Sequence, residues 1–137
     1  MGTVVVVVSI TVAAALTLYM INAESKPPVI SFDGTRLSVK SRMFEAALLW
    51  PQIKKLELVQ ALPKIVLRTN GYSAAGKRRG RFRVEGMGAG QLFVDEKVGS
   101  YIVATTEKSY VIFNAEDAHA TQSLYATISE RWGEHRS

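Results

Sequence analysis

The segment SYVIFNAEDAHATQSLYATISERW, residues 109–132, joins an apolar strand to an amphipathic helix, and this order decides the fold class. Residues 109–113 are expected to pair with a strand at 101–105 across Glu107-Lys108. Asn114 is the expected N-cap of the helix, and Glu116 and Asp117 place negative charge in its first turn. The chain therefore predicts a β-structure that ends in one helix.

That helix carries a single apolar stripe, because its apolar positions recur at steps of three and four residues. The positions are Ala118, Thr121, Leu124, Tyr125, Ile128 and Trp132. Gly133 and a polar tail, residues 133–137, are expected to end the helix. A helix with one apolar face must lie against a sheet.

Upstream of the helix the pattern predicts six or seven short strands. Asp33-Gly34 lies between strand-like segments at 29–32 and 37–40, and this dipeptide is the strongest short-range signal of a hairpin. Trp50-Pro51 breaks the apolar run at 43–49, and a brief helical turn then leads into a strand at 55–59. Further strands are expected at 64–68, 81–85 and 91–94. The expected fold is mainly β, an antiparallel partial barrel capped by the C-terminal helix.

The N-terminal segment differs sharply from the rest of the 137-residue chain. Residues 1–23 contain no charged side chain, so all 17 basic and 12 acidic side chains lie in residues 24–137. As a helix, the 18 residues from 4 to 21 would span roughly 27 Å, close to the ~30 Å hydrocarbon core of a bilayer. The sequence thus predicts a transmembrane anchor at 1–23, a Pro-containing linker at 24–28 and a domain at 29–132.

Two processing alternatives compete with an uncleaved anchor. A cleaved signal peptide would need a basic N-terminal region, which Met1-Gly2-Thr3 lacks, although Asn22-Ala23 offers a weak cleavage site. N-myristoylation would need Ser or Thr where Val6 stands. Basic residues follow the apolar segment and none precedes it, so the positive-inside rule predicts a single-pass protein of the cell membrane with its C-terminal domain in the cytoplasm.

A set of short motifs carries a family resemblance over about residues 29–132. The motifs are RTNGYS at 68–73, GRF at 80–82, LFV at 92–94, YVIFN at 110–114 and LY at 124–125. Together they resemble a bacterial pleckstrin-homology domain family found behind membrane helices. The resemblance implies a strongly bent antiparallel sheet closed by a C-terminal helix, in a membrane setting. It implies no catalytic residues and no particular lipid, because fold does not fix function.

Five cations within seven residues form the only strong functional signal. They are Lys77, Arg78, Arg79, Arg81 and Arg83. Residues 77–79 are expected in a solvated loop, while Arg81 and Arg83 alternate with Phe82 and Val84 on a strand. The cluster is predicted to contact anionic lipid headgroups, at about 1 kcal/mol for each cation near an acidic leaflet. The simpler alternative is a solvated face that only aids solubility and topology.

Two other partners remain open. A partner protein would supply a peptide for a sheet edge or for a groove beside the C-terminal helix. Nucleic acid is the other anionic ligand, but stacking aromatics are scarce near the cations, since Phe82 is expected to face the core.

Enzymatic chemistry finds little support, and no cofactor is expected. The absence of cysteine excludes disulfides, thiolate metal sites and a cysteine nucleophile. Residues 71–77, GYSAAGK, match the start of a phosphate-binding loop, but Arg78 replaces the required Ser or Thr and a strand-like pattern follows. A glycine-bearing hairpin is the better interpretation. His119 and His135 are expected to be exposed, without partners for a metal site or a catalytic triad. The sequence predicts a non-enzymatic interaction module.

Overall fold

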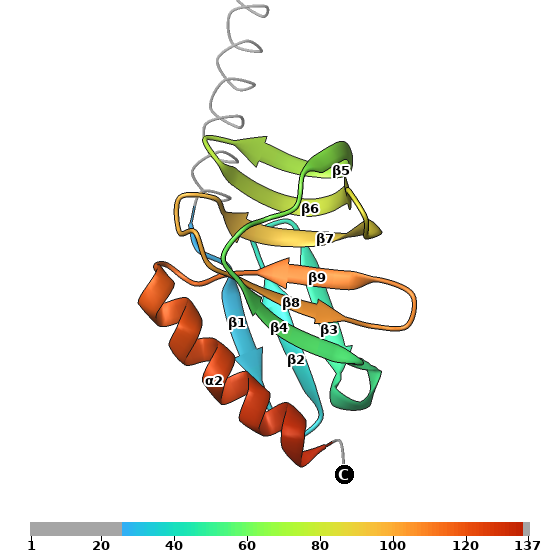
Figure 1. The fold of residues 1–137 in the computed structure, drawn as a ribbon, viewed down its shortest axis with the longest axis vertical. Coiled ribbons are helices and arrows are strands. Elements are labelled where there is room, and N and C mark those ends of the chain that lie inside the picture. The colour runs from blue at the N-terminus through green and yellow to red at the C-terminus, as the bar shows by residue number, and fades with distance from the viewer. Residues whose placement is uncertain (1–25, 136–137) are drawn as a thin grey trace, which may run out of the picture.

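Strands dominate residues 26–135, the part of the chain that the computed structural model describes (Figure 1). The elements are β1 (Val29–Phe32), β2 (Arg36–Lys40), β3 (Glu45–Leu49), the 3-10 helix η1 (Trp50–Gln52), β4 (Lys55–Val59), β5 (Ile65–Ala74), β6 (Lys77–Val84), β7 (Gly88–Asp95), β8 (Tyr101–Thr105), β9 (Tyr110–Phe113) and α2 (Ala118–Glu134). The mainly β prediction with one C-terminal helix is confirmed. The predicted six or seven strands are too few, since this part of the chain contains nine.

The strands form two sheets, one of three strands in the order β1-β2-β3 and one of six in the order β4-β8-β9-β7-β6-β5. The prediction of a purely antiparallel sheet is wrong at one place, because β7 and β9 pair in parallel over three residues from Gln91↔Val111 to Phe93↔Phe113. After β7 the chain leaves one strand position empty and forms β8. It then turns back, and β9 fills the position between β8 and β7. A pattern of apolar residues reports which faces are buried and not which strands are neighbours, so the sequence did not reveal this pairing.

The first hairpin forms where the sequence predicts it. β1 and β2 pair with Phe32 opposite Leu37. The Asp33 carboxylate accepts hydrogen bonds from the backbone N–H groups of Thr35 at 2.7 Å and Arg36 at 3.0 Å. These two bonds stabilise the charged form and hold the pKa of Asp33 below its usual value.

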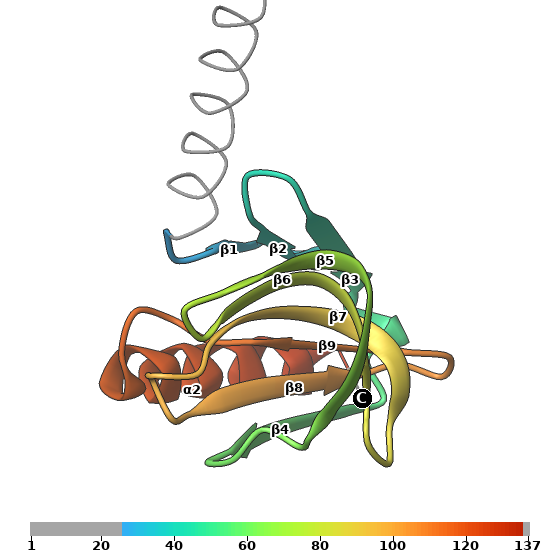
Figure 2. The ribbon, with the colours of Figure 1, turned by 90° about the horizontal axis from the view of Figure 1, so that it is seen from above.

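The six-stranded sheet is strongly curved and buries apolar side chains on both faces (Figure 2). In β8, Tyr101 and Val103 point into the concave core, while Ile102 and Ala104 point to the opposite, convex side. All four residues of β9 are likewise buried. Burial on both faces explains why these strands read as continuous apolar runs and not as an alternation.

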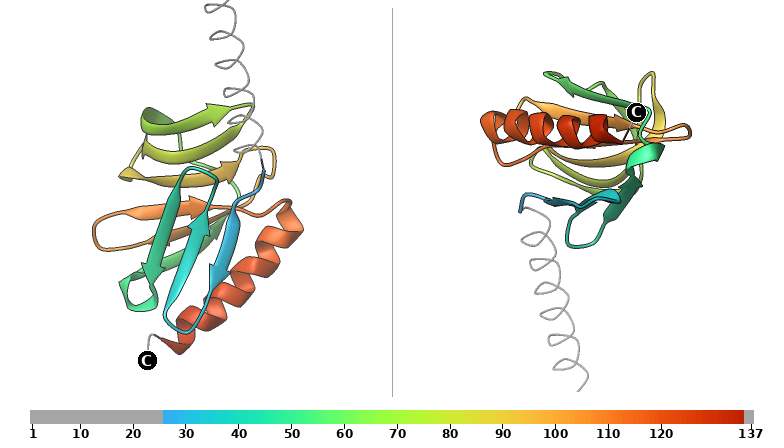
Figure 3. Two further views of the ribbon diagram at one scale, coloured as in Figure 1. Left: turned by 180° about the vertical axis from the view of Figure 1, so that it is seen from behind. Right: turned by 90° about the horizontal axis from the view of Figure 1, so that it is seen from below.

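The three-stranded sheet and α2 together cover the convex face (Figures 1 and 3). Trp50 is buried there, and its indole N–H donates to the carbonyl of Asp33 at 2.8 Å. The Trp132 indole on α2 donates to the carbonyl of Ile53 at 3.0 Å. Ile128 and Thr121 are buried on the same stripe of the helix. The predicted apolar stripe of α2 is thus confirmed.

The ends of α2 differ from the prediction. Asp117 and not Asn114 is the N-cap, and its side chain accepts from the backbone N–H of Ala120 at 2.7 Å. Asn114 lies three residues earlier and is buried. At the other end the helix continues through Gly133 to Glu134, because an exposed glycine in a last turn lowers helix stability without breaking the turn.

The predicted transmembrane anchor at 1–23 lies outside the described residues. Between residues 26 and 135, no helix is both long enough and apolar enough to cross a bilayer.

Candidate functional site

The five predicted cations all lie on one strand. β6 begins at Lys77, so the prediction that residues 77–79 form a solvated loop is wrong. The turn of the β5–β6 hairpin is only two residues long, Ala75 and Gly76, with φ values of 52° and 82°. Such a turn is compact and needs positive φ at both positions, which Gly76 supplies easily. The strand predicted at 64–68 is longer than expected, because β5 continues through Asn70 and Gly71 to Ala74.

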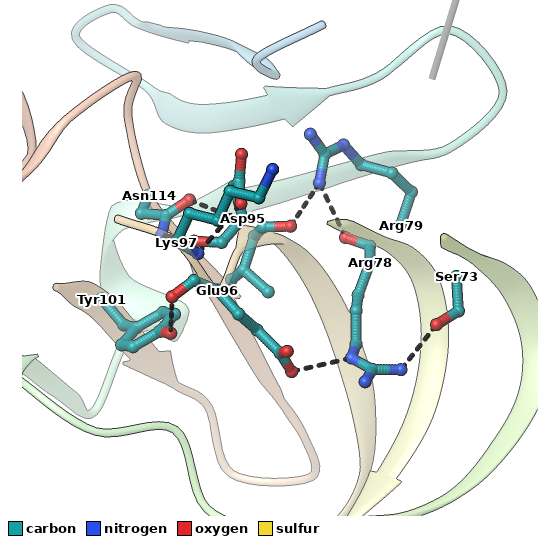
Figure 4. A network of polar contacts seen from close by, with 9 residues as sticks. Ser73, Arg78, Arg79, Asp95, Glu96, Lys97, Tyr101 and Asn114 are labelled. Atoms are coloured by element: carbon teal, nitrogen blue, oxygen red, sulfur yellow. Dashed lines mark hydrogen bonds and ion pairs between the residues drawn. The ribbon is translucent and has the colours of Figure 1, made fainter. Parts of the chain in front are cut away.

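The first two cations of β6 are paired with acidic side chains at or just after the end of β7, and Figure 4 shows the pair of Arg78 with Glu96. Lys77 Nζ lies 3.6 Å from the Asp95 carboxylate, and both side chains are partly exposed. Arg78 Nε lies 2.9 Å from Glu96 Oε1, and its Nη1 donates to Ser73 Oγ at 2.6 Å. These pairs neutralise two of the five charges and tie the hairpin to the neighbouring strand.

Arg79 is buried, with 1% of its surface exposed. Its Nη1 donates to the carbonyl oxygens of Val94 at 2.5 Å and Arg78 at 3.0 Å (Figure 4). Its Nη2 donates to the carbonyl of Lys26 at 3.1 Å, in the linker that enters the domain. A buried guanidinium needs such acceptors. Arg79 therefore joins the linker to the six-stranded sheet and has no surface to offer a ligand.

Arg81 and Arg83 are the cations of this cluster that remain exposed. They share the convex face of β6 with Arg79, and their cross-strand neighbours on β7 are Gln91 and Ala89. The linker lies on this face at Arg79, whereas the face is open at Arg83. The predicted alternation with buried Phe82 and Val84 is confirmed.

Gly80 marks the boundary between the buried and the exposed cations. Its φ is +112°, and a Cβ there would lie 2.6 Å from the carbonyl oxygen of Asn70 and 2.9 Å from the ring of Phe44. Phe44 belongs to the connection between β2 and β3, which is therefore packed against β6 at this point. Met43, one residue earlier, is 55% exposed.

A polar network beside these cations stabilises the turn between β7 and β8 (Figure 4). The buried side chain of Asn114 accepts from the backbone N–H of Asp95 and donates to the carbonyls of Asp95 and Ser100, all at 3.0–3.1 Å. Tyr101 is buried nearby, and burial, together with the charges of Glu96 and Asp95, raises the pKa of its hydroxyl. Asn114 is thus a structural residue of this turn.

Two adjoining hollows lie along β3, on the side away from α2. One of about 300 Å³ is lined by Glu45, Leu48, Arg81 and Gln91. The other, of about 500 Å³, shares Leu48 and Thr106 with the first and continues to Lys54 and Lys108. We call the two hollows together the β3 groove. No motif in the sequence predicts this groove, because it arises from the packing of the two sheets.

Searches with family models, curated proteins and solved structures found no match to this chain.

The other residues considered for catalysis, metal binding or phosphate binding do not form a site together. His119 and His135 are exposed, and the imidazole of His135 stacks on Trp50 with ring centroids 5.7 Å apart. Among residues 26–135, no cluster of three or more His, Asp or Glu side chains is arranged to hold a metal ion. Residues 71–77 lie on a hairpin and its turn, and a strand follows them in place of the helix that a phosphate-binding loop requires.

Proposed function

We propose that this chain is a non-enzymatic interaction module with a pleckstrin-homology-like domain, held at a membrane by residues 1–23. In this proposal the convex face of β6 contacts anionic lipid headgroups through Arg81 and Arg83. The observation that carries the proposal is the hydrogen bond from Arg79 to the carbonyl of Lys26. It fixes the linker on the same strand face that carries the two exposed arginines.

The distances along β6 support contact with a surface near the linker. Residues two apart on a strand are about 7 Å apart, so Arg81 and Arg83 follow Arg79 at about 7 and 13 Å. An anchor that ends a few residues before Lys26 therefore keeps both guanidinium groups close to the headgroups. Met43 offers an exposed apolar side chain on the neighbouring connection.

The expected strength of this contact is modest. Two cations near an acidic leaflet contribute about 2 kcal/mol in total, less than half of what five free cations would supply. Because the domain is tethered, this contribution orients the domain at the surface and does not need to recruit it from solution.

The assignment to the pleckstrin-homology-like architecture is part of the proposal. The strong curvature of the six-stranded sheet and the single C-terminal helix support it. The parallel pairing of β7 with β9 and the separate sheet β1-β2-β3 depart from an all-antiparallel barrel. The cytoplasmic location is proposed from the basic residues that follow the anchor, and a reporter enzyme fused after Ser137 tests it.

A single fluorescent label tests the lipid contact, since the natural chain has no cysteine that would also react. Ala89 is exposed and lies opposite Arg83, so an Ala89→Cys variant places a polarity-sensitive dye beside the proposed contact. The full chain is reconstituted in nanodiscs of zwitterionic lipid, with or without anionic lipid. We expect a blue shift of the dye with anionic lipid that high salt reverses. Equal emission in both lipids would contradict the proposal.

A further inference from the structure

The outer edge of β3 has backbone groups available for pairing with another strand. Ser41 N–H donates to Phe44 O at 2.8 Å, and Trp50 N–H donates to Thr35 O at 3.3 Å, which fixes the alternation of hydrogen bonds between β2 and β3. Ala46 and Leu48 consequently bond inward to β2, while the N–H and C=O groups of Glu45 and Ala47 point outward. β3 is the last strand of its sheet, so no strand among residues 26–135 pairs with these outward groups.

The β3 groove lies along this open edge. Leu48 is common to both of its hollows, so the groove follows the strand and is not a pit at one end. Five residues of extended chain span about 16 Å, which is the length of β3 itself. A segment lying in the groove would extend the three-stranded sheet by one strand and cover more of the convex face of the six-stranded sheet.

A buried acceptor within the groove lacks a partner. Gln91 Oε1 is shielded from solvent, and nothing in the described part of the chain donates a hydrogen bond to it. Gln91 lines the same hollow as Arg81, its cross-strand neighbour. A buried acceptor without a donor is unfavourable, so a ligand gains affinity if its N–H group reaches this oxygen when the Gln91 amide turns toward the groove.

The charges of the groove favour acidic side chains near its ends. Arg81 lies in one hollow, and Lys54 and Lys108 lie in the other. Glu45 and Glu107 offset part of this charge, which leaves one net positive charge among the five groups. Small side chains line the stretch between, where Ala46 and Ala47 leave room for another backbone.

We infer that the β3 groove binds an extended segment of a partner protein, about five residues long, as an additional strand beside β3. The segment pairs with the outward groups of Glu45 and Ala47, donates a hydrogen bond to Gln91 Oε1 and places an acidic residue near Arg81. This inference goes beyond the lipid contact proposed above. It shares Arg81 with that contact, but it depends on the backbone of β3 and the side chain of Gln91, which the lipid contact does not involve.

Two designed peptides test the inference on the full chain in zwitterionic nanodiscs. Fluorescein-labelled Glu-Val-Thr-Val-Thr-Val-Glu is compared with a peptide in which Lys replaces both Glu residues. We expect the Glu-ended peptide to bind about tenfold more tightly, as measured by fluorescence anisotropy. Its binding should move the NMR signals of the Ala47 backbone amide and of the Gln91 side-chain amide.

Two variants remove separate parts of the groove. Ala47→Pro deletes one outward N–H while leaving the bonds of Ala46 and Leu48 to β2, a position where an edge strand tolerates proline. Gln91→Leu replaces the unpartnered acceptor with an apolar side chain of similar size, so it should not impair folding. Each is expected to weaken binding of the Glu-ended peptide by about tenfold.

Arg83→Gln is the matched control, because it should reduce the response to anionic lipid and leave peptide affinity unchanged. A weaker response to anionic lipid in Arg83→Gln, with unchanged peptide affinity, would therefore concern the lipid proposal and not the groove. The inference is overturned by failure of both peptides to bind, or by binding that survives both Ala47→Pro and Gln91→Leu. NMR signal changes confined to β5 or α2 would also overturn it. So would a shift of the Ala47 amide signal that self-association or anionic lipid causes and the peptide does not.

Discussion

Arg79 and Arg83 lie on the same face of the same strand, four residues apart, yet they have opposite roles. Arg79 is covered by the linker and donates to three backbone carbonyls, whereas Arg83 is exposed to solvent. The neighbouring cations follow the same division, since Lys77 and Arg78 are paired with acids and Arg81 is exposed. A dense run of cations in a sequence therefore does not measure the positive charge of a surface. The segments and side chains that pack on the strand decide which of these cations can bind a ligand.

The largest expected effect comes from Arg79→Met, which removes three hydrogen bonds to backbone carbonyl groups. We expect a loss of about 2–4 kcal/mol in the free energy of unfolding, because three hydrogen bonds from a buried charged group are lost, one of which holds the linker. Arg81→Met, on the same face, should change it by less than about 0.5 kcal/mol. Denaturant unfolding of the full chain in detergent micelles, followed by tryptophan fluorescence, measures both. Equal effects of the two substitutions would remove the distinction between buried and exposed arginines.

Gly80→Ala tests the boundary between the two halves of β6. Its Cβ would clash with the carbonyl of Asn70, and alanine is strained at a φ of +112°. We expect a loss of about 2–3 kcal/mol in unfolding free energy by the same method. Gly34→Ala is the control, because a Cβ there meets nothing within 4 Å and should cost little. A Gly80→Ala variant as stable as the control would mean that β6 does not need this conformation.

The double variant Lys77→Gln, Arg78→Gln should have a smaller effect on stability. Ion pairs that are partly exposed contribute about 0.5–1 kcal/mol each at most, and salt weakens them. We therefore expect a loss below about 2 kcal/mol that shrinks as the salt concentration rises. A loss that does not depend on salt would show that packing, and not charge pairing, is the contribution of these side chains.

The smallest expected effect concerns alkaline pH. Burial raises the pKa of Tyr101, so the folded state favours the neutral hydroxyl, while an unfolded Tyr ionises near pH 10. The contribution of Tyr101 to stability is thus complete below pH 10 and is lost as the pH rises above it. Tyr101→Phe should reduce the fall in unfolding free energy between pH 9 and 11. Tyr110, whose pKa burial also raises, accounts for part of the remaining fall.

Local signals in the sequence predicted several elements well. Asp33-Gly34 located the first hairpin, and the apolar stripe from Thr121 to Trp132 located the helix face that packs on the sheet. The strands at 55–59 and 101–105 have the predicted bounds. These features depend on side chains close in sequence, which explains why a reading of the sequence finds them.

Long-range features escaped prediction for a physical reason. Asn114 looked like an N-cap, but its amide instead bonds to Asp95 and Ser100, which are distant in sequence. Arg79 looked like a loop cation, and its burial depends on the linker at Lys26, 53 residues earlier. The β3 groove depends on how two sheets pack. No pattern along the chain encodes such contacts, and of the five predicted cations only Arg81 and Arg83 are exposed.

The division of β6 into paired and exposed cations is tested by comparing two double variants that remove the same charge from the strand. Arg81→Gln, Arg83→Gln and Lys77→Gln, Arg78→Gln each take away two cations from the Ala89→Cys-labelled chain in anionic nanodiscs. We predict that the first double variant abolishes the salt-sensitive blue shift and that the second one retains it. Equal losses in the two variants would show that only net charge matters, and would contradict the division of β6 at Gly80.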